Sequence, residues 1–233
     1  MDFTKAIEKG GEVFGWKNKW QGWGKATAVN GVKRRGVGIG VHSNADVGED
    51  VSEAQVKLSA DGRVMLNVCV SESGHGQRSS LCKMAAEVLN LPLENVKMSP
   101  PDTEVNPFEF GLMGSRGTYA VGSAVIAAAE DARRRLLDLA ATKLGTTPDH
   151  LDTEDGMIYI IGRPEKRMPW RRIMGLYRTI TGEGRFEPDH SLCNFLMTFV
   201  EVEVDTETGK VELKNVVNAT DAGQIISPKT LEG

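Results

Sequence analysis

The sequence predicts an α+β fold in which helices flank mixed β-sheets. Two segments show the alternation of apolar and polar residues that is typical of β-hairpins, each interrupted by a turn. Between them lie two segments in which apolar residues recur at helical spacing. The likeness of the hairpins indicates two related units, each built from a hairpin and a helix. The pattern alone leaves open which neighbouring strands run parallel.

The two predicted hairpins lie far apart in the sequence. The first pairs residues 54–58 with 64–70 around the turn Asp61-Gly62, and the second pairs 200–204 with 211–213. Apolar residues occupy every second position of these strands, which places them on one face of a sheet.

Two helices are predicted between the hairpins. Ser79 or Ser80 is expected to cap the first, because a serine hydroxyl can accept a hydrogen bond from a backbone N–H. Gly145 is expected to end the second, since glycine readily adopts the left-handed conformation found after helix ends. The apolar positions are Leu81, Met84, Ala85 and Val88 in the first helix and Val121, Val125, Ala128, Ala132, Leu136 and Leu139 in the second.

Weaker signals complete the chain. They predict, in order, a helix over 3–14, a tryptophan-rich linker over 16–23, a strand over 36–41, a strand over 157–161 and a helix over 170–177. The tryptophans of the linker are expected to pack against a neighbouring element. We therefore expect an N-terminal helix and linker, residues 1–32, followed by one domain, residues 33–233.

The 233 residues have the composition of a soluble globular protein, with 40% hydrophobic and 26% charged residues. The net charge of −4 argues against a nucleic-acid surface, and the basic runs 33–35 and 133–135 read as a loop and a solvated helix face. No apolar run approaches the roughly 18 residues that span a bilayer, and the first residues lack the apolar core of a signal peptide. A cytoplasmic protein without membrane partners is expected. Three widely spaced cysteines predict buried thiols rather than disulfides or a metal site.

Two glycine segments each run from irregular chain into a predicted helix. We call residues 73–80 the first glycine segment and residues 114–119 the second. Backbone N–H groups at a helix start carry partial positive charge, and glycine lets a ligand approach them closely. Either segment alone also reads as an ordinary turn and cap. Together they predict two helix starts that hold one phosphorylated cofactor.

Six short segments follow one another in an order that resembles the molybdenum hydroxylases, which include xanthine dehydrogenase, aldehyde oxidoreductase, nicotinate dehydrogenase and 4-hydroxybenzoyl-CoA reductase. They are Ser71-Glu72-Ser73-Gly74-His75-Gly76, Ala85-Ala86-Glu87, Pro101-Asp102-Thr103, Ser115-Arg116-Gly117-Thr118-Tyr119, Val200-Glu201-Val202-Glu203-Val204-Asp205 and Asp221-Ala222-Gly223-Gln224-Ile225-Ile226-Ser227-Pro228. The resemblance covers residues 33–233 and corresponds to part of the molybdopterin-binding region of the large subunit. Each segment is weak alone, whereas the ordered series is specific.

The resemblance implies a molybdopterin cofactor with molybdenum, which in bacteria is often the cytosine dinucleotide form. By match of position, Gly74, His75 and Gly76 would contact the cofactor near the metal. Its phosphate or pterin would be held through backbone N–H groups and hydroxyls, by Ser115, Arg116, Gly117 and Thr118. No side chain of this chain is expected to bind the metal directly. The resemblance places iron–sulfur clusters and FAD on partner domains or subunits.

The first glycine segment departs from the family. Where relatives usually have glutamine between the two glycines, with its amide donating toward the cofactor, this chain has His75. A neutral imidazole still donates one N–H, and Gln77 two residues later is a possible substitute. His75 also reads as an ordinary loop histidine, so both interpretations stay open.

The implied reaction is hydroxylation of a heteroaromatic ring or an aldehyde, with water as the oxygen source. In relatives the glutamate that acts as general base lies beyond the position of Gly233, so the catalytic residues are unknown. The chain is expected to be inactive alone, as a fragment of a larger polypeptide or one half of a split subunit.

Glu72 reads as a cap or as a cofactor neighbour, and Asp102 and Glu104 read as turn residues. Phe108 and Phe110 fit a substrate funnel or a loop anchor.

Two other functions remain open from the sequence. A non-catalytic binding or assembly module that retains the fold without the cofactor would fit His75 and the missing base. An unrelated nucleotide-binding protein is suggested only by the glycines, because the chain lacks the GxxxxGK[ST] loop of nucleotide-binding proteins.

Overall fold

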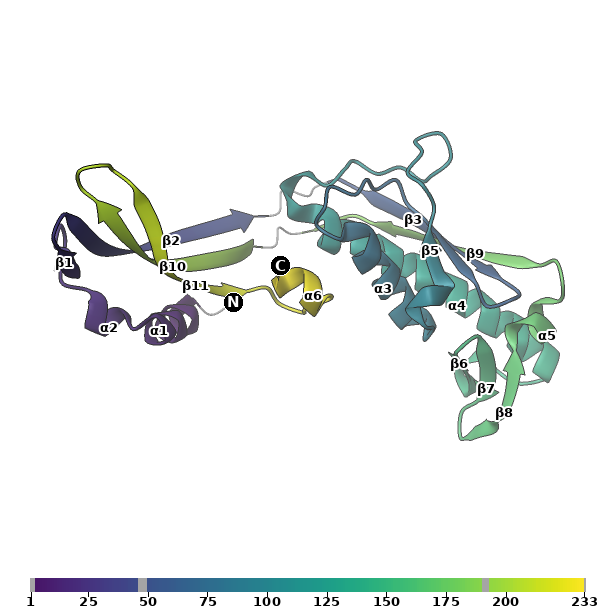
Figure 1. Cartoon of the computed structure of the whole chain (residues 1–233). Coiled ribbons are helices and arrows are strands. Elements are labelled where there is room, and N and C mark those ends of the chain that lie inside the picture. Colours follow the sequence, from purple (N-terminus) through teal and green to yellow (C-terminus); the bar gives the residue numbers. More distant parts are fainter. Residues whose placement is uncertain (1–2, 46–49, 190–192, 233) are drawn as a thin grey trace. The chain divides into compact units, whose positions relative to one another are not determined.

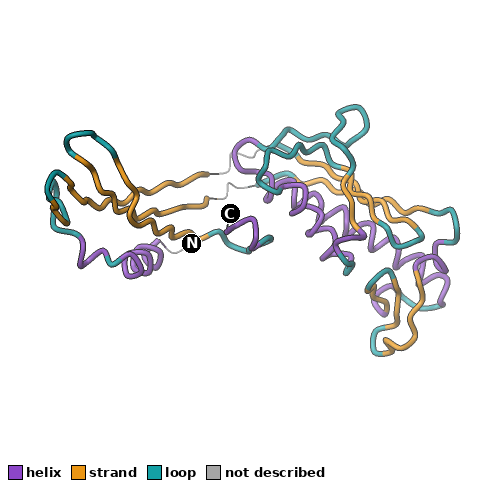
Figure 2. The backbone as a smooth tube through the Cα atoms, viewed as in Figure 1, coloured by secondary structure: helices purple, strands orange, loops and turns teal. Residues whose placement is uncertain are grey.

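The computed structural model describes residues 3–45, 50–189 and 193–232. Contacts divide the chain into two compact units, the first formed by Met1–Ala45 with Leu192–Ile225 and the second by Asp46–Ser191 with Ile226–Gly233. The predicted segment 1–32 lies in the first unit, together with residues 33–45 and 192–225 of the predicted domain. Helices and strands occur in both units, which confirms the α+β prediction (Figure 2).

The first unit is an antiparallel sheet that carries one helix. The strands lie in the order β1, β2, β10, β11, and helix α1 packs on β10 and β11 (Figure 1). Phe14 of the helix is buried with Met197 and Phe199 of the sheet. The bounds are α1 Phe3–Phe14, β1 Ala28–Asn30, β2 Lys33–Ala45, β10 Cys193–Asp205 and β11 Val211–Asp221. The predicted helix over 3–14, the strand over 36–41 and the second hairpin are therefore confirmed.

The tryptophan-rich linker packs against its own unit. It contains a short helix, α2 (Trp16–Lys19). The rings of Trp16 and Trp20 stack with their centroids 5.2 Å apart, and Trp16 meets the edge of Phe199 at 6.1 Å. This confirms the predicted packing role for Trp16 and Trp20, whereas Trp23 is 92% exposed.

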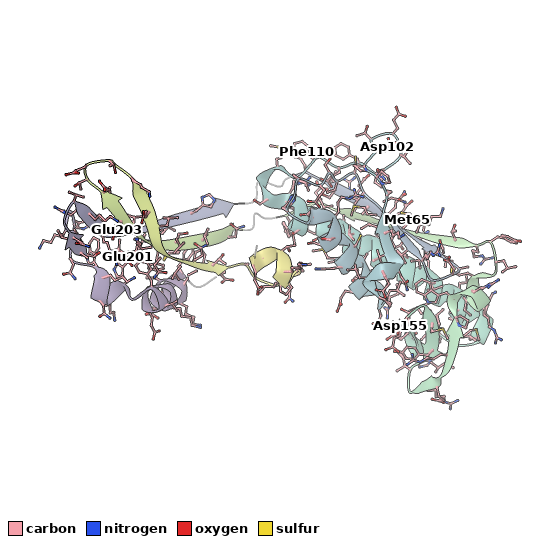
Figure 3. The ribbon with its side chains drawn as sticks, in the orientation of Figure 1. Met65, Asp102, Phe110, Asp155, Glu201 and Glu203 are labelled. Atoms are coloured by element: carbon pink, nitrogen blue, oxygen red, sulfur yellow. The ribbon has the colours of Figure 1, made fainter. Side chains whose placement is uncertain are left out.

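A cluster of charges joins three strands of the same sheet. Glu203 on β10 accepts hydrogen bonds from Lys33 at 3.1 Å and from Arg35 at 2.9 Å, and Lys214 lies 3.6 Å away (Figure 3). The hydrogen bonds from Arg35 and Lys33 lower the pKa of Glu203 to about 2. Two of the three basic residues of the run 33–35 are thus paired within the chain, and they share one carboxylate.

The second unit contains a mixed sheet covered on one face by two helices. The strands lie in the order β5, β4, β3, β9, with β4 and β5 parallel and the other pairs antiparallel. Helices α3 and α4 contact each other, and α4 lies on β3 and β9 (Figure 1). The bounds are β3 Ser52–Ser59, β4 Val64–Asn67, α3 Gln77–Leu89, β5 Val96–Met98, α4 Gly122–Leu144 and β9 Thr179–Phe186.

Smaller elements complete the second unit. A three-stranded antiparallel sheet precedes the short helix α5, and helix α6 lies near the end of the chain. The remaining bounds are η1 Leu93–Asn95, η2 Met113–Ser115, η3 Gly117–Val121, η4 Pro148–His150, β6 Leu151–Glu154, β7 Met157–Ile160, β8 Arg163–Pro169, α5 Trp170–Met174 and α6 Pro228–Glu232. Among the described helices, none is both long and apolar enough to cross a membrane.

Small residues let α4 approach the sheet very closely. A Cβ atom added to Gly182 would lie 2.2 Å from the carbonyl oxygen of Ala128, and one added to Gly184 would lie 2.0 Å from that of Ala124. Both glycines therefore permit direct contact between the strand and the helix backbone. The predicted apolar positions of α4 are buried in this core, except Leu139, which is partly buried.

Two predicted helix ends are corrected. Ser79 and Ser80 do not cap α3, because the helix begins at Gln77 and both hydroxyls donate to the carbonyl oxygen of Gly76, at 2.8 and 3.0 Å. The helix predicted over 170–177 ends at Met174, since the next residue, Gly175, has a φ of 78°. Gly145 ends α4 as predicted, with a φ of 66°.

Candidate cofactor site

The two glycine segments meet at the starts of their helices. Gln77, the first residue of α3, is only 5% exposed, and a Cβ atom added to Gly117 would lie 2.8 Å from its side-chain oxygen Oε1. Further along the two helices, a Cβ at Gly122 would lie 2.8 Å from Sδ of Met84. Glycine at these positions therefore lets the two helices touch, and the segments converge as the sequence predicted.

Gln77 has an unused donor at this junction. Its side-chain nitrogen Nε2 is buried and has no hydrogen-bond partner among the described residues. A buried donor without a partner costs about 1–3 kcal/mol, so such groups are usually paired. An amide donor beside two helix starts fits a ligand rich in oxygen and nitrogen acceptors, such as a pterin.

Glu72 occupies the backbone N–H groups of the first glycine segment. Its carboxylate accepts hydrogen bonds from the backbone of Gly74 at 2.9 Å, Gly76 at 3.0 Å and Arg78 at 3.1 Å. These hydrogen bonds hold the pKa of Glu72 below its ordinary value, and the one from Arg78 has the largest effect. The cap interpretation of Glu72 is confirmed. The prediction of free N–H groups at this helix start is wrong for these three residues.

His75 lies at the surface of the same loop. Its ring nitrogen Nδ1 is 3.4 Å from the hydroxyl of Ser73 and 3.7 Å from the carboxylate of Glu72, and the side chain is 47% exposed. The neighbouring Gly76 is covered by α6, because a Cβ atom there would lie 2.9 Å from Cγ2 of Thr230. His75 is therefore exposed, whereas the glycine beside it is covered.

Arg116 of the second glycine segment has its side chain turned into the protein. It is 1% exposed, and its guanidinium forms an ion pair with Glu109 at 2.5 Å. It also donates to the hydroxyl of Ser52 at 3.0 Å and to the carbonyl oxygens of Gly111, at 3.2 Å, and Asp50. The guanidinium therefore fixes the second glycine segment to β3, and Arg116 could reach a ligand only through its backbone.

The rest of the second segment offers backbone and hydroxyl groups. Ser115 and Thr118 are exposed, Gly117 is buried, and Ser115 has the left-handed φ of 65°. The chain then continues as the π-helical turn η3 into α4. The predicted residues Ser115 to Thr118 thus stand at a helix start, beside Gln77.

Glu109 was missed by sequence reasoning. Its carboxylate is fully buried, and burial raises its pKa above the ordinary value, opposed by Arg116 and by hydrogen bonds from Ser52 and Gly111. Phe110 beside it places its ring 5.7 Å from the guanidinium of Arg116 (Figure 3). That contact supports the loop-anchor interpretation for Phe110. The only signal in the sequence was an acid seven residues before an arginine.

The other acids of this loop have local roles. Asp102 accepts a hydrogen bond from the backbone of Glu104 at 2.9 Å, which is the turn geometry expected from the sequence. Within the described part of the chain, no group of three or more histidine, cysteine, aspartate or glutamate side chains could hold a metal ion. Cys69 and Cys82 are free thiols.

Replacing Glu72 with glutamine should make the free energy of unfolding depend less steeply on pH in acid. A carboxylate whose pKa is lowered on folding stabilises the fold above its ordinary pKa, and this contribution is lost as the pH falls through the folded-state value. The wild type should therefore lose stability from about pH 5 downward more steeply than E72Q. Urea unfolding between pH 7 and pH 3 measures this, with E94Q, at an exposed glutamate, as control. Equal slopes for E72Q and wild type would refute the cap's electrostatic role.

Comparison with known proteins identifies the family. Residues 9–233 match the family described as the molybdopterin cofactor-binding domain. The chain is 28% identical to the xanthine dehydrogenase molybdenum-binding subunit of Escherichia coli O157:H7, over 98% of this chain and 32% of that protein. It is also 28% identical to the nicotine 6-hydroxylase large subunit of Paenarthrobacter nicotinovorans, over 82% of this chain and 25% of that protein. The chain thus spans about a third or less of the length of these relatives.

Solved structures share the fold. The CO dehydrogenase of Oligotropha carboxidovorans superposes with a TM-score of 0.82 at 19% identity, over the whole of this chain and 32% of that one. The quinoline 2-oxidoreductase of Pseudomonas putida 86 gives a TM-score of 0.75 at 21% identity, over 98% of this chain and 30% of that one. With its family match and fold, this chain belongs to the molybdopterin cofactor-binding domain family found in the large subunits of molybdenum hydroxylases.

Proposed function

We propose that the chain is the cofactor-binding portion of a molybdenum hydroxylase that acts on a heteroaromatic or aldehyde substrate, with water as the oxygen source. The observation that carries this proposal is Gln77, whose unpartnered buried amide lies against Gly117 where two glycine segments converge. Membership of a molybdopterin-binding family supports it. Molybdopterin with its metal, either as such or in its cytosine dinucleotide form, supplies the redox chemistry when bound.

The residues of this chain bind and orient in that proposal. Gln77 donates its amide N–H to the pterin, and His75 borders the same position from the exposed side of the loop. Gly74 and Gly76 keep the backbone close, while Ser115, Gly117 and Thr118 hold phosphate or pterin oxygens through N–H groups and hydroxyls. Arg116 contributes through its backbone, because Glu109 binds its side chain.

The proposal makes the chain one part of a larger assembly in the cytoplasm. The general base would lie in the remaining molybdopterin portion, and electrons would leave through partner subunits with iron–sulfur clusters and FAD. The chain alone would then be inactive. The shares of 32% and 25% that it covers in two relatives support this view.

The test is co-expression of this chain with the remaining molybdopterin portion of its assembly. The purified complex should contain molybdenum by mass spectrometry and a fluorescent pterin after acid extraction. Q77A should retain about three- to tenfold less of both, as expected for one lost hydrogen bond inside a site. Q21A, at an exposed glutamine of the first unit, is the matched control.

H75A separates the two candidate donors. Loss of pterin in Q77A with retention in H75A supports Gln77 as the donor, and the reverse pattern assigns that role to His75. A wild-type complex that folds, assembles and contains neither molybdenum nor pterin would overturn the proposed function. That result would favour the non-catalytic module instead.

A further inference from the structure

Two basic runs of this chain form ion pairs with its own acids. In the run 133–135, Arg133 pairs with Asp152 at 2.6 Å, and both Arg134 and Arg135 pair with Asp131 on the same helix. In the run 33–35, Lys33 and Arg35 share Glu203. Every arginine of the run 133–135 is therefore paired, and so are two of the three basic residues of the run 33–35.

A third basic cluster lacks such ion pairs. Arg171 and Arg172 on α5 and Arg178 before β9 are all exposed. Within the described residues, none of the three forms an ion pair with an acid, in contrast to the two runs above. The cluster therefore presents uncompensated positive charge on a chain whose net charge is −4.

The local fold holds these side chains outward. Trp170, Ile173 and Met174 of α5 are at most 4% exposed and anchor the helix in the core. Arg171 and Arg172 consequently lie on its outer side. Gly175, with a φ of 78°, then ends the helix and turns the chain away from the core.

Two apolar side chains lie at the centre of the cluster. Leu176 is 61% exposed and Tyr177 is 95% exposed, and both line a shallow hollow together with Arg171, Arg178 and Asp61. The carboxylate of Asp61 pairs with Arg63, which lies outside this lining. A nearly fully exposed tyrosine between arginines has the composition of a protein interface, where Tyr and Arg are enriched. Binding a partner that covers these two side chains would be favourable, because it removes apolar surface from water.

We infer that Arg171, Arg172, Leu176, Tyr177 and Arg178, the α5 patch, bind an acidic protein surface with an apolar centre. The arginines of the patch would face carboxylates on the partner, and the exposed Leu176 and Tyr177 would contact its apolar centre. A nucleic acid fits less well, since three exposed arginines on a chain of net charge −4 fall short of the extended basic surface that a polyanion requires. Names of relatives such as "molybdenum-binding subunit" and "subunit gamma" describe components of assemblies, where such a patch has a use. The inference is independent of the cofactor.

A labelled peptide of repeated Glu-Glu-Leu triplets tests the patch by fluorescence anisotropy with the full chain. The double variant R171E/R178E should bind at least about tenfold more weakly, which corresponds to about 1.4 kcal/mol. R134E/R135E makes the same change in net charge on the balanced helix face, so it should bind within about twofold of wild type. Thermal unfolding checks that both variants are folded.

Y177A measures the apolar part, and it should weaken binding severalfold without changing its salt dependence. Equal losses in R171E/R178E and R134E/R135E would overturn the inference, because net charge alone would then explain the binding. Tighter binding of a thymidine oligonucleotide than of the peptide would overturn it as well. The apo protein suffices for every measurement, so failure here is distinct from failure to bind molybdopterin.

Discussion

Glu109→Ala is expected to lower the free energy of unfolding by about 3–5 kcal/mol, the cost of leaving a buried charge without its partner. Arg116 is 1% exposed, and its ion pair with Glu109 spans 2.5 Å. The remaining acceptors, at Ser52, Gly111 and Asp50, are uncharged and would not balance the guanidinium. Urea denaturation at pH 7 measures the effect.

The control for this prediction is Glu104→Ala, at an exposed glutamate of the same loop, which should change stability by less than about 0.5 kcal/mol. Glu109→Gln should fall between the two, since its amide oxygen still accepts a hydrogen bond from Arg116. A loss below about 1 kcal/mol in the alanine variant would mean that the ion pair does not anchor the second glycine segment.

Gly184→Ala is expected to cost about 3 kcal/mol or more, the upper range for overpacking a core. The added methyl group would lie 2.0 Å from the carbonyl oxygen of Ala124 and 2.4 Å from the backbone nitrogen of Ala128. These are backbone atoms of α4, so no side-chain rotation relieves the clash, and β9 must separate from the helix. Soluble yield and the midpoint of thermal unfolding measure the loss.

Gly38→Ala provides the matched control in a strand. An added Cβ at Gly38 of β2 meets no atom within 4 Å, and its φ is not in the left-handed range. We expect its stability to stay within about 0.5 kcal/mol of wild type. If G184A were as stable as G38A, the close contact between β9 and α4 would be wrong.

The elements with clear periodicity could be predicted from the sequence, and one important strand could not. The hairpins and the long helix α4 have alternating or helical apolar patterns, and the structure confirms them. Strand β9 was missed because Gly182 and Gly184 take positions where an apolar alternation would show. Their partner is the backbone of α4, and a contact of this kind leaves no apolar side chain at those two positions.

The candidate site was predictable in outline but not in its pairing. Glycines before helices indicated two helix starts, and the structure brings them together through Gln77 and Gly117. The roles of Glu72 and Glu109 depend on which donors the fold places within 3 Å, and spacing along the chain does not determine that. For the same reason Arg116, read as a ligand-binding residue, has its guanidinium on Glu109.

The carboxylate of Glu72 at the start of α3 gives the protein a counter-ion of its own. The loop keeps its shape before any ligand arrives, so a chain awaiting its cofactor need not unfold there. A ligand that takes these same N–H groups must exchange with Glu72 and release it to water. The exchange lowers the affinity for that ligand. A protein without the carboxylate would bind the ligand more tightly, but its loop would be less ordered before binding.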